Sequence, residues 1–109
     1  MAGKPVLRVT TDRTTHDDPS EDLLFILCDE ELGHDGAFLV LETISDGHFI
    51  QVAGNFNTGS YRLERRAGSV DTHEHAHSSD VRRVHDELVA WAFPAAPRSV
   101  PDLDWQPGF

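Results

Sequence analysis

The dipeptide Asp46-Gly47 constrains the fold more than any other feature, because it lies between two apolar segments of the chain. A two-residue type I′ turn needs a positive φ at both central positions, and Asp followed by Gly tolerates that geometry. The sequence therefore predicts a β-hairpin in this region, with Glu42 directly opposite Gln51. In this register the apolar side chains of the two strands share one face, which we expect to be buried: Leu39, Leu41, Ile50 and Val52.

The predicted hairpin is the centre of a longer antiparallel meander that spans residues 37–66. Turn residues fill the connection after the hairpin, and Tyr61–Arg66 then alternates in the manner of a strand with one polar face. A further strand is expected from about Val70 to His77. The β-branched segment Val6–Thr11 predicts another strand, at an edge of the sheet. We therefore expect an antiparallel meander sheet of four to five strands.

Two helices are expected to cover one face of this sheet, because a single antiparallel layer with one wet face is not stable alone. Leu23–Cys28 is an apolar run that fits either a buried strand or a helix, and Ser20 as an N-cap favours a helix of about twelve residues. A second helix follows Asp80 and ends before Pro94. Its apolar residues recur every three or four positions: Val81, Val84, Leu88 and Trp91. The predicted fold class is α+β, with two helices packed on one face.

The length of 109 residues predicts a single domain with one modest core. Residues 1–5 are expected to be a frayed start. Residues 95–109 are expected to pack on the domain as a tail, with a short edge strand around Leu103–Trp105, because each large apolar side chain gains about 1.5–3 kcal/mol on burial. No membrane span and no signal peptide is recognisable, and the lone Cys28 cannot form an internal disulfide, so we expect a cytoplasmic protein with no membrane partner.

Charge is distributed unevenly along the chain, whose net charge is −10. This balance argues against a nucleic-acid partner, because phosphate neutralisation needs a basic stripe. Between Asp12 and Asp35 there are nine acids and one base, Arg13. One interpretation of this run is a solvated surface, and the other is a surface that attracts a basic protein. The candidate partner-binding residues, with two from the open face of the sheet, are Asp17, Asp18, Glu21, Asp22, Glu30, Glu31, Glu42 and Gln51.

One segment has the composition of a metal site, because His73, His75 and His77 alternate along a predicted strand. Their side chains would project to one face about 7 Å apart, and imidazoles bind zinc (Zn), nickel (Ni) or copper (Cu). A flat strand spreads the outer two histidines too far for one ion, so a site needs a bend or a fourth ligand. The simpler interpretation is a solvent-facing strand that is rich in histidine, and a response to pH near 6 is a third. No catalytic residue is predicted, since no nucleophile lies beside an identifiable base.

The order of these segments resembles that of small immunity proteins of bacterial polymorphic toxin systems. The resemblance is carried by the FLVLE strand, the DG turn, the HFIQVAG and YRLERR strands, the amphipathic helix and the DLDW tail, and is strongest over 38–66 and 81–105. It implies a non-enzymatic, single-domain inhibitor that binds a cognate toxin, often a basic enzyme that acts on nucleic acid. The three alternating histidines are not a feature of that resemblance.

Together these observations favour a non-enzymatic acidic binding protein without a cofactor, of the immunity or inhibitor type, that blocks a basic toxin or effector. The alternative is a metal-binding module or small metalloenzyme that uses His73, His75 and His77. A homodimer joined through the open sheet face, or through the edge at Val6–Thr11, is compatible with either function.

Overall fold

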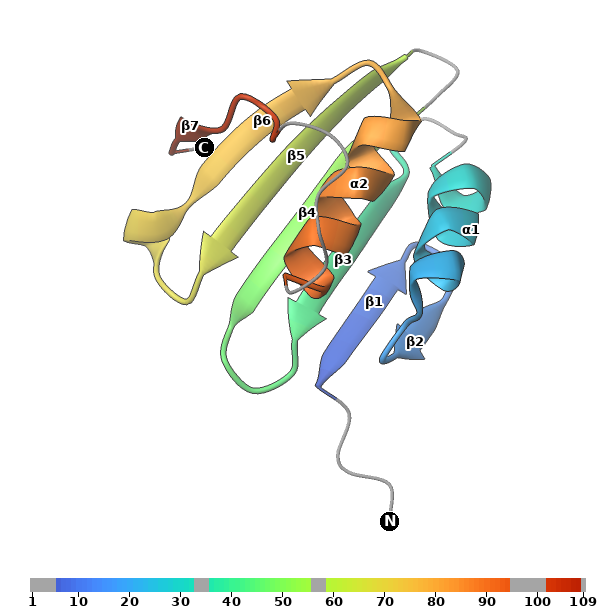
Figure 1. The fold of residues 1–109 in the computed structure, drawn as a ribbon, viewed down its shortest axis with the longest axis horizontal. Coiled ribbons are helices and arrows are strands. Elements are labelled where there is room, and N and C mark those ends of the chain that lie inside the picture. The colour runs from blue at the N-terminus through green and yellow to red at the C-terminus, as the bar shows by residue number, and fades with distance from the viewer. Residues whose placement is uncertain (1–5, 33–35, 56–58, 95–101, 109) are drawn as a thin grey trace.

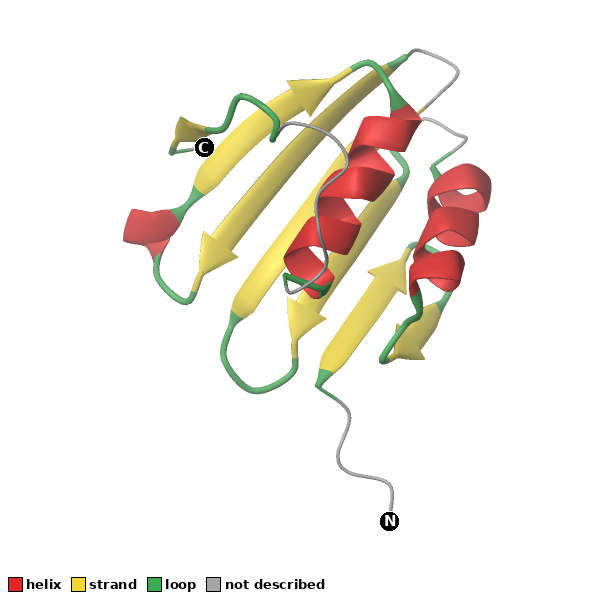
Figure 2. Cartoon of the chain, viewed as in Figure 1, coloured by secondary structure: helices red, strands yellow, loops and turns green. Residues whose placement is uncertain are grey.

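The computed structural model describes residues 6–32, 36–55, 59–94 and 102–108. Seven antiparallel strands form one sheet in the order β2-β1-β3-β4-β5-β6-β7, and both described α-helices lie on the same face of it (Figures 1 and 2). This architecture confirms the predicted α+β class. Along the chain the elements are β1 (Leu7–Thr11), β2 (Thr15–Asp17), α1 (Glu21–Glu31), β3 (Phe38–Thr43), β4 (His48–Asn55), β5 (Ser60–Ala67), a one-turn 3₁₀ helix (Val70–Thr72), β6 (Glu74–Ser78), α2 (Val81–Ala92) and β7 (Gln106–Pro107).

The sheet has more strands than the four to five that the sequence predicts. The three-residue β2 pairs with the outer side of β1, so the strand at Leu7–Thr11 is not the edge strand that the sequence predicts, and the two-residue β7 follows directly after the predicted tail strand. Strands this short carry no recognisable alternation of apolar and polar residues. The strand expected from Val70 begins only at Glu74, because a 3₁₀ helix capped by the Ser69 side chain occupies the first part of that segment.

The central hairpin differs from its predicted register by two residues. Glu42 lies opposite Phe49 instead of Gln51, and a four-residue loop replaces the expected two-residue turn. The Thr43 side chain closes this longer loop, because its Oγ1 accepts a hydrogen bond from the His48 N–H at 3.2 Å and donates one to the His48 carbonyl at 3.4 Å. Since the shift is an even number of residues, every side chain keeps its predicted face of the sheet.

The core lies between the helices and the sheet face that the sequence predicts to be buried. The side chains of Leu39, Leu41, Ile50 and Val52 all have 0% exposure. The helices cover this core on the side away from the sheet, with α1 packed on β3 and α2 packed on β4, β5 and β6. The helix residues buried in it are Leu24, Leu27, Cys28, Val84 and Leu88.

Helix α1 begins where the sequence predicts, because the Ser20 hydroxyl accepts a hydrogen bond from the Leu23 N–H at 3.1 Å. Its acidic C-terminal end would oppose the helix dipole without a nearby positive charge. Arg13 supplies that charge from the β1–β2 turn: its Nε donates to the Glu31 carboxylate at 2.9 Å, and its Nη2 donates to the Glu30 carbonyl at 3.4 Å. The only base in the acidic run therefore stabilises the end of this helix.

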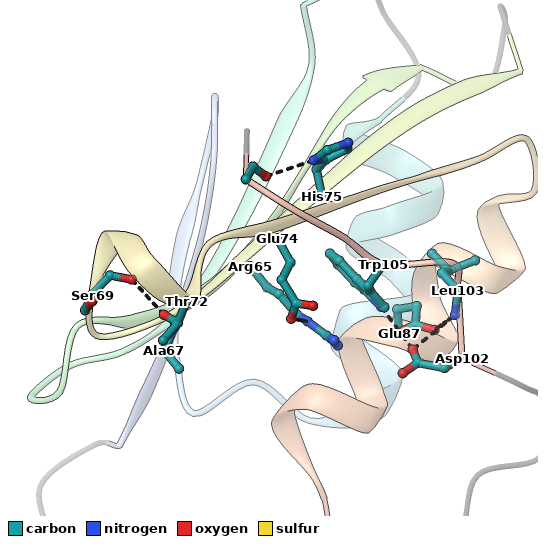
Figure 3. A network of polar contacts seen from close by, with 11 residues as sticks. Arg65, Ala67, Ser69, Thr72, Glu74, His75, Glu87, Asp102, Leu103 and Trp105 are labelled. Carbon is teal, nitrogen blue, oxygen red and sulfur yellow. Dashed lines mark hydrogen bonds and ion pairs between the residues drawn. The ribbon is translucent and has the colours of Figure 1, made fainter.

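The first described part of the tail, 102–105, packs on the helix side of the sheet, and 106–108 runs along its edge beside β6 (Figure 3). Leu103 is only 8% exposed, and its N–H donates to the Glu87 carboxylate of α2 at 2.9 Å. The Trp105 ring lies 4.0 Å from the guanidinium carbon of Arg65, and its indole N–H donates to the Asp102 carboxylate at 3.0 Å. These contacts place β7 beside β6 at the edge of the sheet. Residues 1–5, 95–101 and 109, which include other parts of the predicted termini, lie outside the described residues.

Candidate functional site

The outward side of α1 carries two large apolar side chains that the fold leaves in water. Phe25 is 51% exposed and Ile26 is 46% exposed, although the neighbouring Leu24 and Leu27 are buried. The outward acids of the helix lie around them, one turn before or after, since residues three or four apart are neighbours on a helix surface. We define the α1 surface by these exposed residues: Glu21, Asp22, Phe25, Ile26, Asp29 and Glu30.

Three of the predicted partner-binding acids contribute to this surface, and three others are occupied in the fold itself. Glu21, Asp22 and Glu30 are exposed on α1. Glu31 is only 8% exposed and pairs with Arg13. The acidic surface is therefore smaller than the predicted one.

The two acids of the β2 end also act within the fold. Asp17 pairs with Arg8 of β1 at 2.8 Å. Asp18 accepts hydrogen bonds from the backbone N–H groups of Leu7 and Val6, each at 2.9 Å, and these bonds lower the pKa of its carboxyl group. Both side chains hold the entry to the first strand, which explains why acids occur there.

The remaining predicted residues, Glu42 and Gln51, lie on the opposite face of the sheet from the helices. Gln51 Nε2 donates to the Glu64 carboxylate at 2.7 Å. The eight predicted residues therefore do not form one site. The sequence prediction also missed Phe25 and Ile26, although a run of six apolar residues, once helical, must place some of them on the outward side.

Phe25 also borders a small cavity of about 160 Å³ between the two helices. Its ring meets the His85 ring edge-on, with the centroids 5.2 Å apart. Cys28 and Asp29 line the cavity from α1, and Val81, Arg82 and His85 line it from α2. The α1 surface is therefore hollowed beside Phe25 and not flat.

The three histidines of the metal hypothesis bond to three different parts of the protein. Because Arg66 Nε can only donate, the Nδ1 atom of His73 accepts at 3.2 Å, and His73 Nε2 carries the proton that it donates to Glu64 at 3.1 Å. His75 Nδ1 lies 2.8 Å from the Gly108 carbonyl, and His77 Nε2 lies 3.4 Å from Arg62 Nη1.

This arrangement does not assemble the predicted metal site. Both ring nitrogens of His73 are used, and the residue is 3% exposed, so it cannot join His75 and His77 around one ion. Among the residues that the structure describes, no group of three or more His, Cys, Asp or Glu side chains is placed to hold a metal. The alternating histidines instead contribute to a hydrogen-bonded face of the sheet.

Glu64 is the central acceptor of that face. Its own burial raises the pKa of its carboxyl group, but hydrogen bonds from His73 and Gln51, together with the charge of Arg62, outweigh this effect and bring the pKa below its ordinary value. A carboxyl group whose pKa is lower in the folded state stabilises the fold above its unfolded pKa, and loses that contribution as pH falls. The ionised Glu64 carboxylate should therefore contribute to the free energy of unfolding at neutral pH.

Glu64→Gln should reduce the free energy of unfolding by about 1–2 kcal/mol at pH 7, because neutral hydrogen bonds replace charge-assisted ones. The difference from wild type should shrink as pH falls from about 5 through 4.5 and towards the lower folded pKa. Urea unfolding between pH 7 and 3.5, followed by circular dichroism, measures it. Glu30→Gln, at an exposed carboxylate, is the control and should stay within about 0.5 kcal/mol at pH 7. A difference for Glu64→Gln that grows towards acid pH would contradict the expectation.

Comparison with known proteins assigns no relative to this chain. No protein-family model matches it, and no curated protein or solved structure is significantly similar to it. The resemblance to immunity proteins therefore stays a prediction from the order of the segments. The described α-helices have 11 and 12 residues, and no described helix is long and apolar enough to cross a bilayer.

Proposed function

We propose that this chain is a non-enzymatic binding protein that blocks a basic toxin or effector through the α1 surface, in the manner of an immunity protein. The observation that supports this most directly is the exposure of Phe25 and Ile26 within a helix face of four acids and no base. Exposed apolar side chains that adjoin one another are a common feature of protein-binding surfaces. Their burial by a partner would supply the free energy of association.

The acids on the same helix give this surface its selectivity for a basic partner. A chain with a net charge of −10 attracts a positively charged protein over a distance and speeds their encounter. Interfaces commonly place apolar anchors at the centre and charged residues at the rim, and the α1 surface has that arrangement. The proposal places the chain in the cytoplasm, where a toxin that acts on nucleic acid would meet its substrate.

The test takes the products of the open reading frames on either side of this gene as candidate partners, and measures the binding of each to the purified chain by surface plasmon resonance. The proposal expects one of them to be a basic protein that binds. Ile26→Ala should raise the Kd at least tenfold, because it removes an anchor at the centre of the interface. Ile44→Ala is the matched control: it is the same substitution at a similarly exposed residue, 42% against 46%, in the β3–β4 loop. Its Kd should stay within twofold of wild type.

A second pair of measurements tests the charge component. Asp29→Lys with Glu30→Lys should slow association about tenfold at low salt, and the difference should shrink at high salt as the charges are screened. Lysines near the C-terminal end of a helix suit its dipole, so the fold should persist. Equal effects of Ile26→Ala and Ile44→Ala, or no binding by the wild-type chain, would contradict the proposal.

A further inference from the structure

The sheet face turned away from α1 and α2, here called the open face, carries no net charge on its strands. Among the residues of the described strands, its charged side chains are three bases and three acids: Arg8, Arg62, Arg66, Asp17, Glu42 and Glu64. The whole chain, in contrast, has a net charge of −10. A second copy of this chain is repelled by acidic surfaces such as that of α1, but meets no net repulsion at the open face.

The strand register arranges these charges in rows that are complementary about β4. In one row Glu42 of β3, Phe49 of β4 and Arg66 of β5 lie side by side. The acid lies on one side of β4 and the base on the other. A surface with this arrangement can pair with itself. A two-fold axis that runs parallel to β4, midway between the two open faces, brings β3 of one copy over β5 of the other.

A second row repeats this complementarity. Phe38 of β3, Ala53 of β4 and Arg62 of β5 are neighbours across the sheet. Phe38 is 37% exposed and Ala53 is also exposed, although β3 and β4 are strands in the middle of the sheet. The same two-fold axis places the Phe38 ring over the Arg62 guanidinium of the partner copy, which is a favourable cation–π arrangement.

We infer that two copies of this chain form a symmetric dimer by stacking their open faces, with Glu42 of each copy paired to Arg66 of the other. Sheets that pack face to face lie about 10 Å apart with their strands nearly aligned, which matches an axis along β4. The two Phe49 rings meet near the axis. The α1 surface lies on the other side of the sheet and stays accessible, so the dimer does not depend on the proposed function.

Much of the polar part of the open face has internal partners before the copies meet. Gln51 bonds to Glu64 at 2.7 Å, Glu64 to His73 at 3.1 Å, and Arg8 to Asp17 at 2.8 Å. Polar groups that keep such partners lose less free energy when water leaves an interface than unpaired groups do. Burial of the apolar side chains in the two rows then favours association.

The experiment is a charge swap, read by sedimentation velocity of the purified chain at about 5–500 µM, a range in which a Kd near 10 µM is measured directly. Wild type should sediment as a dimer at high concentration. Glu42→Arg and Arg66→Glu should each raise the dimer Kd at least 100-fold, because like charges then meet twice. An equimolar mixture of these two variants should form a heterodimer, because both contacts of that pair are again between opposite charges.

Two further measurements keep the result interpretable. Ala53→Arg places a charge beside the axis without removing any internal bond of the open face, and should also give a monomer. Thermal unfolding of each variant shows whether it is folded. A monomeric wild type at 500 µM would overturn the inference, and so would a dimer that persists in Glu42→Arg and Ala53→Arg. Failure of the single variants to recombine in the mixture would overturn the assigned Glu42–Arg66 contact and with it the proposed axis.

Discussion

Gly54→Ala is expected to destabilise the protein by about 3–5 kcal/mol, a large part of the stability of a domain of this size. Gly54 has a φ of +128°, which residues with a side chain rarely adopt. A Cβ atom at this position would lie 2.1 Å from the carbonyl oxygen of Ser60. That oxygen belongs to the neighbouring strand β5, where Tyr61 pairs with Gly54, so the clash is between two backbones and cannot be relieved by a side-chain rotation. Urea unfolding at pH 7 measures the loss.

Gly59→Ala is the matched control, because it makes the same change on the other side of the same hairpin connection. Gly59 also has a positive φ, +67°, but a Cβ atom there meets nothing within 4 Å. It should lose only about 1 kcal/mol, which is the usual difference between Ala and Gly in the left-handed region. Equal losses for the two variants would mean that backbone conformation, and not the close approach of β4 to β5, determines the role of Gly54.

The faces of the sheet were predictable from the sequence because side-chain alternation depends only on the parity of the register. The prediction paired Glu42 with Gln51, and the structure pairs Glu42 with Phe49, yet the same side chains are buried. The turn type was not predictable from Asp46-Gly47 alone, since the bonds of the Thr43 side chain to His48 decide the loop length. Hydrogen bonds from a side chain to the backbone, such as these, cannot be recognised from the pattern of apolar and polar residues.

The candidate site was predictable only in part, because charge along a sequence does not show which acids already have partners. Glu31 and Asp17 looked like members of an acidic surface, but each pairs with an arginine of the fold. Phe25 and Ile26 were not predicted to form a surface, because the apolar run Leu23–Cys28 fits either a buried strand or a helix. Their exposure follows only once the run is known to be a helix, since a helix cannot bury all of its faces against one sheet.

Cys28 lies on the buried side of the same helix, and its surroundings determine its reactivity. Its side chain is 1% exposed, and burial, with a smaller contribution from Asp29, raises the pKa of the thiol to about 12. Tyr61 is buried in the same core cluster. Among the described residues its hydroxyl has no hydrogen-bond partner, and burial raises its pKa as well. The centre of the protein therefore holds two neutral groups, which suits packing of α1 on the sheet.

Cys28 should react with a thiol reagent such as DTNB about 10³-fold more slowly than an exposed thiol at pH 8, because only the thiolate is nucleophilic and a pKa near 12 leaves about one molecule in 10⁴ ionised. Absorbance at 412 nm follows the reaction, and 8 M urea should restore the ordinary rate. The variant Cys28→Ala with Ser79→Cys provides an exposed thiol before α2 as the reference. If native Cys28 reacts as fast as that reference, α1 opens readily from the sheet, and the helix that carries the α1 surface is not the fixed element that the proposed binding requires.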